Sequence, residues 1–60
     1  MNDIIRIGLR GIQELRNNIH KCETDMEYLD LHSRINNLNL CVIDEMLKEI
    51  GEREGENNHN

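Results

Sequence analysis

The side chains that could bind a metal or attack a substrate in this chain include His20, Cys22, His32 and Ser33. On a helix, His20 and Cys22 point about 200° apart, so they cannot share a zinc ion. Ser33 follows His32 directly, and because adjacent helical residues face different ways, the two do not form a nucleophile with its base. We therefore expect no catalytic residue, no metal ligand and no cofactor, and a protein that is not an enzyme.

The charge is acidic overall and unevenly distributed, with a net value of −5. Residues 1–22 carry four basic and two acidic side chains, whereas residues 23–60 carry three basic and ten acidic ones. This asymmetry favours packing of the first segment against the second. A basic stripe on the first segment, formed by Arg6, Arg10, Asn17 and Lys21, could contact phosphates. The acidic net charge and the lack of aromatic residues in residues 1–22 favour a solvated face instead, so a DNA-binding regulator is only the second alternative.

A heptad repeat in the first segment predicts an amphipathic helix over residues 3–22, with Asp3 as its N-cap. The repeat positions are Ile5, Gly8, Ile12, Leu15, Ile19 and Cys22. Gly8 lies on this repeat, and a second glycine follows at Gly11; each costs about 1 kcal/mol in a helix interior relative to alanine. Gly8 is therefore either a point of close contact with another backbone or the sign of an irregular first turn.

A second helix is predicted over residues 24–50. Thr24 and Glu27 have the spacing of a capping box, which marks a helix start. The apolar positions that follow are Tyr28, Leu31, Ile35, Leu38, Val42 and Met46. Gly51 is the residue type that commonly follows a helix end, so we expect the helix to stop there. The polar residues 51–60 are expected to form a disordered tail.

The two helices favour an all-α antiparallel hairpin, residues 1–50, with its turn near Thr24. A single long helix also fits, since Met26 follows Ile19 by seven residues and Leu29 follows Cys22 by seven, across a turn without Gly or Pro. The least favoured alternative breaks the second helix at Asn36-Asn37 and places a short strand over residues 38–43.

Apolar side chains lie on more than one face of the predicted second helix. One stripe contains Leu38, Val42 and Met46, and a second lies roughly a third of a turn away. The second stripe is Leu40, Ile43, Leu47 and Ile50. One neighbouring helix in the same chain can cover only one stripe, and a chain of 60 residues has a small core. We therefore expect self-association as a dimeric helical bundle or coiled coil.

The predicted protein interface comprises Leu40, Ile43, Met46, Leu47 and Ile50. In a hairpin that turns near Thr24, the first helix covers the second only to about Asp44. The last two turns then overhang, and their apolar side chains are free to contact either a second copy or a target protein.

One run, Ile12-Gln13-Glu14-Leu15-Arg16, resembles the opening helix of the sporulation aspartyl-phosphate phosphatases of Gram-positive bacteria, which are small helical hairpins. Their hallmark is Ser-Gln-x-Leu-Asp on the second helix. The nearest runs here are Leu40-Cys41-Val42-Ile43-Asp44, which keeps only the final apolar-acid pair, and His32-Ser33-Arg34-Ile35-Asn36, which lacks both the Gln and the Asp. The resemblance implies a hairpin and makes a phosphatase the first alternative function, but its activity is not carried over.

The sequence thus predicts a small regulatory protein that self-associates and binds another protein, as an inhibitor or adaptor. We expect it in the cytoplasm, because no apolar run reaches the roughly 18 residues of a membrane span and the N-terminus lacks the features of a secretory signal. The small size and the Asn- and Ile-rich composition suggest a bacterial or phage origin. The residues do not name the target protein.

Overall fold

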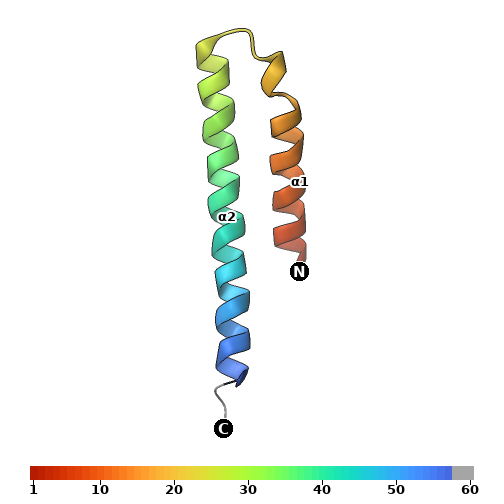
Figure 1. Cartoon of the computed structure of the whole chain (residues 1–60), viewed down its shortest axis with the longest axis vertical. Coiled ribbons are helices and arrows are strands. Elements are labelled where there is room, and N and C mark those ends of the chain that lie inside the picture. The colour runs from red at the N-terminus through yellow and green to blue at the C-terminus, as the bar shows by residue number, and fades with distance from the viewer. Residues whose placement is uncertain (58–60) are drawn as a thin grey trace.

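A computed structural model describes residues 1–57 of the chain. It contains helix α1 (Asp3–Asn17), a turn of 3-10 helix, η1 (Ile19–Lys21), and helix α2 (Asp25–Asn57). The helices lie side by side and antiparallel, and α2 extends well beyond the start of α1 (Figure 1). The predicted all-α hairpin is confirmed, and the alternatives of one continuous helix and of a strand over residues 38–43 are wrong. Neither described helix combines the length and the apolar character needed to cross a membrane.

The N-cap of α1 is Asn2. Its Oδ1 accepts a hydrogen bond from the backbone N–H of Ile5 at 2.9 Å, while Asp3 is already the first helical residue. The prediction of Asp3 as N-cap is therefore wrong by one position. Asp3 still lies in the first turn, where a negative charge interacts favourably with the helix dipole.

Helix α1 ends at Asn17, earlier than the predicted residue 22. The side-chain Nδ2 of Asn18 donates to the carbonyl oxygen of Glu14 at 3.0 Å, and its backbone N–H donates to the carbonyl oxygen of Leu15 at 3.0 Å. Asparagine side chains compete in this way with the helical hydrogen-bond pattern. Beyond Asn18, Ile19–Lys21 form η1, and Cys22, whose backbone is extended, leads into the turn.

The start of α2 follows the predicted capping box. Thr24 Oγ1 accepts from the backbone N–H of Glu27 at 3.1 Å, and Glu27 Oε2 accepts from the backbone N–H of Glu23 at 3.0 Å. The Glu27 carboxylate thus binds the residue before Thr24, and this hydrogen bond ties the turn to the start of α2.

The other end of α2 lies beyond its predicted stop, because the helix runs through Gly51 to Asn57. A C-terminal glycine cap requires a positive φ, and no described glycine has one. Gly51 is followed by Glu52, Arg53 and Glu54, which have good helix propensity, so a single glycine does not end the helix. The predicted helix end at Gly51 is therefore wrong, since residues 51–57 are helical, and residues 58–60 of the predicted tail lie outside the described part.

The core lies between the two helices and follows the predicted heptad positions. Its buried residues are Ile5, Ile12, Ile35 and Val42. Partly buried side chains surround them: Leu15, Ile19, Leu31, Leu38 and Met46. The glycines of α1 face this core: a Cβ at Gly8 would lie 2.5 Å from Val42 Cγ2, and one at Gly11 would lie 3.3 Å from Leu38 Cδ1. Gly8 is therefore a point of close contact within a regular helix.

Candidate protein-interaction surface

Helix α2 carries apolar side chains on two faces, as predicted. Its inner face, with Leu38 and Val42, packs against α1. The second stripe, which we call the outer face, is solvent-exposed, and Ile50 at its end also borders a hollow beside Met1 and Ile5. The exposed fractions are 63% for Leu40, 51% for Ile43, 59% for Leu47 and 43% for Ile50. These values leave four large aliphatic side chains in a row without cover from the described part of the chain.

Met46, the fifth residue of the predicted interface, lies differently from the other four. Its side chain is partly buried and packs against the core between the helices. At about 100° per residue, Met46 lies 40° from both Val42 and Ile50, so it stands at the border between the inner and the outer face. Met46 therefore contributes mainly to the hairpin, and only its remaining exposed surface is open to a partner.

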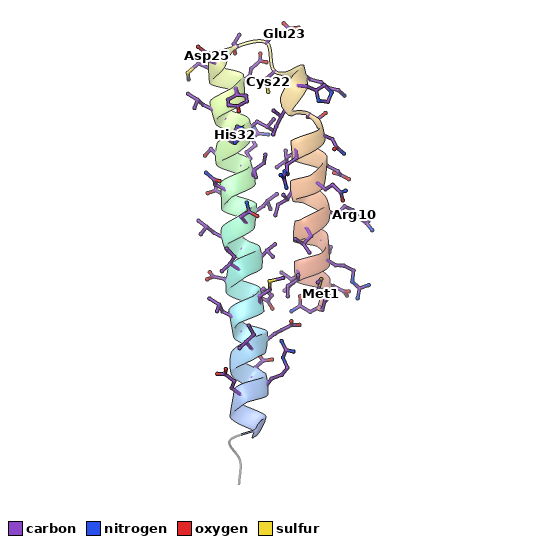
Figure 2. The ribbon with its side chains drawn as sticks, in the orientation of Figure 1. Met1, Arg10, Cys22, Glu23, Asp25 and His32 are labelled. Atoms are coloured by element: carbon purple, nitrogen blue, oxygen red, sulfur yellow. The ribbon has the colours of Figure 1, made fainter. Side chains whose placement is uncertain are left out.

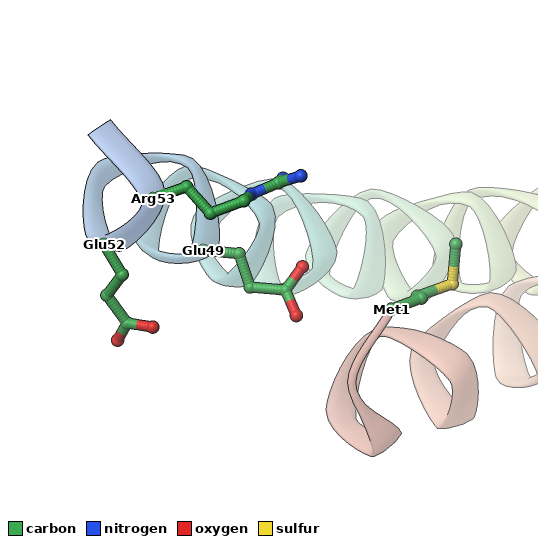
Figure 3. A pocket seen from close by; sticks show the side chains of 4 residues that line it. All are labelled: Met1, Glu49, Glu52 and Arg53. Carbon is green, nitrogen blue, oxygen red and sulfur yellow. The ribbon is translucent and has the colours of Figure 1, made fainter. Parts of the chain in front are cut away.

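The end of α1 marks where the inner face of α2 loses its cover. Asn2 Nδ2 donates to Glu45 Oε1 at 3.1 Å, close to the predicted limit at Asp44. Beyond this contact, two adjoining open hollows of about 300 Å³ each lie where α1 begins. One is lined by Met1, Glu49, Glu52 and Arg53, with Glu49 reaching toward Met1 from the overhanging helix (Figure 3). The other adds Ile5, Met46 and Ile50.

The residues that could do chemistry do not form a site. His32 is half-buried between the helices, with its ring centroid 4.4 Å from that of Tyr28, and its Nε2 is buried without a hydrogen-bond partner. His20 is exposed in η1, and Cys22 is a half-buried free thiol at the end of that turn, near the top of the hairpin (Figure 2). Among the described residues, no group of three or more His, Cys, Asp or Glu side chains could hold a metal ion.

The basic side chains of the first segment lie on the outside of the hairpin. Arg10 points away from α2 (Figure 2), and Arg6 is exposed, with its Nη2 donating to the carbonyl oxygen of Met1 at 3.4 Å. Lys21 lies in η1, past the end of α1. The ion pairs recorded in the described part are both within α2: Asp30 with Arg34 at 3.2 Å and Glu45 with Lys48 at 3.9 Å.

Two apolar residues near the start of α2 were not assigned to the candidate interface from the sequence. Met26 and Leu29 are 75% and 61% exposed and precede the outer face at heptad spacing. The sequence signal for them is that they continue the repeat of Ile19 and Cys22, the same pattern that also fits one long helix. On α1, Ile4 and Ile7 are also exposed, at 59% and 70%.

The two runs compared with the phosphatase hallmark both lie on α2, but on different parts of it. Asp44 is exposed, whereas Ile35 is buried in the core and Asn36 is exposed. Comparison of the chain with protein families, with curated proteins and with solved structures gave no match.

Proposed function

We propose that this chain is a small, non-enzymatic regulatory protein of the cytoplasm that self-associates and binds another protein through α2. The single observation that carries the proposal is the outer face, formed by Leu40, Ile43, Leu47 and Ile50, which is exposed in the hairpin. Scattered exposed apolar side chains are normal on a protein surface, but a contiguous row at helical spacing is typical of an interaction site.

The energetics favour cover of this face. Fully burying a Leu or Ile side chain is worth roughly 1.5–3 kcal/mol. Association itself costs an estimated 4–15 kcal/mol in lost freedom, in rough terms. The four side chains are about half exposed, so covering them on two copies contributes roughly 6–13 kcal/mol, which is comparable with that cost. The hairpin core has only four buried side chains, so the assembly would also stabilise the fold.

The overhang of α2 is the proposed contact for a target protein. Here the apolar Met46 and Ile50 lie beside the charged Glu49 and Arg53 in the hollow next to Met1. A mixed surface of this kind can bind an amphipathic helix of another protein, with the apolar side chains as anchors and the charged ones at the rim. An inhibitor or adaptor acts in this way, by occupying a surface of its target.

Thermal unfolding at several protein concentrations tests self-association. Anything that binds only the native chain raises its melting temperature, so assembly makes the transition concentration-dependent. We expect the melting temperature of the unmodified chain to rise with concentration and that of Ile43→Glu to be independent of it. Gln13→Glu is the matched control, because it adds the same charge at an exposed position on α1, away from the outer face of α2. A concentration-independent transition of the unmodified chain would contradict the proposal.

A further inference from the structure

The outer face is part of a longer heptad seam on α2. Its eight positions alternate spacings of three and four residues, and six of them are apolar. They are Met26, Leu29, Ser33, Asn36, Leu40, Ile43, Leu47 and Ile50. All eight are exposed in the hairpin. This spacing, kept over four heptads, is that of a helix that supercoils with another helix of the same length.

This outer seam lies nearly opposite the inner face of α2. Ile35 and Val42 are buried against α1 and lie seven residues apart. The outer-seam residues lie one or five positions after such a buried position, which places them on the side of α2 that faces away from α1. A partner helix on the outer seam would therefore leave α1 in place. The hairpin can form its own core and a second interface at the same time.

Ser33 and Asn36 interrupt the apolar residues of the seam and indicate which helix covers it. An apolar target helix would bury these polar groups without hydrogen-bond partners, which is costly. In a second copy of α2, aligned parallel and in register, Ser33 meets Ser33 and Asn36 meets Asn36. Every apolar residue then meets its own kind, and a buried Asn pair is a known determinant of coiled-coil register.

No antiparallel alignment covers both the first part of the seam, Met26 and Leu29, and the second part, Leu40 to Ile50. If the polar positions of two antiparallel helices meet, Leu47 and Ile50 extend past the turn of the other hairpin and remain uncovered. If the apolar halves meet instead, Leu40 pairs with Ile50 and Ile43 with Leu47, but Met26 and Leu29 lie beyond the end of the partner α2 at Asn57 and remain uncovered. In the parallel alignment, Asn37, Asn39 and Asp44 lie at the edges of the contact formed by Leu40, Ile43, Leu47 and Ile50. Only Asp44 is charged, so charge repulsion between the two copies at these positions is small.

We infer that the partner on the outer seam is a second copy of this chain, with the two α2 helices parallel and in register and Asn36 facing Asn36. This inference rests on the self-association proposed above and adds its orientation and register. Leu at the first and Ile at the fourth heptad position, as in Leu40, Ile43, Leu47 and Ile50, favours more than two strands. The parallel seam can therefore recruit further copies around the same axis.

Distances between spin labels on separate copies test the orientation. The natural thiols are replaced in the background Cys22→Ser, Cys41→Ser, and single labels are placed by Glu23→Cys at the turn or Glu52→Cys near the far end. Both glutamates are exposed, and circular dichroism checks that each variant stays helical. Parallel packing predicts a short distance between two labels at 23 and between two labels at 52. In a mixture of the two variants, the 23-to-52 distance should be long, about 40 Å from the rise of 1.5 Å per residue.

A short 23-to-52 distance with long distances between like labels would overturn the orientation while leaving self-association intact. A chain that sediments as a monomer would remove the proposed self-association itself, so the two failures are distinguishable.

A second pair of variants tests the register. Asn36→Leu should tighten assembly at least tenfold and broaden the label distances, because a polar layer that defines register becomes apolar. Gln13→Leu, at an exposed position on α1, is the control for an added surface leucine and should do neither. Equal effects of the two variants would overturn the role of Asn36.

Discussion

Gly8 of α1 lies directly against Val42 of α2, so close that a Cβ at position 8 would lie 2.5 Å from Val42 Cγ2. Valine is branched at Cβ and has few alternative rotamers, so Val42 cannot yield easily. The two helix backbones approach each other closely at this point because Gly8 has no side chain.

The first prediction concerns this contact. Gly8→Ala should lower the free energy of unfolding by up to about 2 kcal/mol, since overpacking costs about 1–3 kcal/mol and the gain in helix propensity recovers only about 1 kcal/mol of it. Urea denaturation followed by circular dichroism measures the change. The double variant Gly8→Ala, Val42→Ala should lose less stability than the sum of the losses in the two single variants, because alanine at position 42 relieves the overlap with the new Cβ at position 8.

The matched control is Gly51→Ala. A Cβ at Gly51 meets nothing within 4 Å, and Gly51 lies inside α2 with no positive φ. The same substitution should therefore stabilise the chain there by up to about 1 kcal/mol. Destabilisation by Gly51→Ala would indicate that Gly51 ends the helix after all.

A second prediction separates the two roles of Asn2, which caps α1 through Oδ1 and donates to Glu45 through Nδ2. Asn2→Ala should cost about 1 kcal/mol or more, since it removes both. Asn2→Asp keeps the cap but places a carboxylate against that of Glu45, so the double variant Asn2→Asp, Glu45→Gln should be more stable than Asn2→Asp alone. Chemical denaturation of the four chains gives the comparison. If Asp3→Ala were more damaging than Asn2→Ala, the N-cap assignment would be wrong.

The third prediction addresses the phosphatase alternative. The hairpin architecture agrees with that resemblance, but Asp44 is exposed on α2 without the Ser and Gln of the hallmark nearby in its run. We expect the purified chain to release no phosphate from a phosphorylated receiver domain, with a phosphatase of that family as the positive control. Turnover that is lost in Asp44→Ala, with helicity unchanged, would replace the proposed function with an enzymatic one.

The parts of the fold that followed from the sequence are those set by local spacing. The heptad positions Ile5, Ile12, Ile35 and Val42 became the core, and the capping box at Thr24 marked the start of α2. The outer stripe followed from the same periodicity, although its role as an interface stays a prediction.

The parts that the sequence did not predict depend on choices that residue type alone leaves open. Asn18 ends α1 because its side chain bonds to the carbonyl of Glu14, and Gly51 continues α2 because its φ stays negative. Met46 shares a stripe with Leu38 and Val42 and also belongs to the predicted interface, and its contact with the core between the helices decides that it packs inward. Each of these outcomes depends on a dihedral angle or on a neighbour that is distant in the sequence.

Sedimentation equilibrium of the full chain at micromolar concentrations tests most directly whether α2 presents an interaction surface. The account predicts an average mass above that of one chain, 7.1 kDa, that rises with concentration, and a return to the mass of one chain in Ile43→Glu but not in Gln13→Glu. A folded chain that remains monomeric across this range, with the outer face exposed, would contradict it.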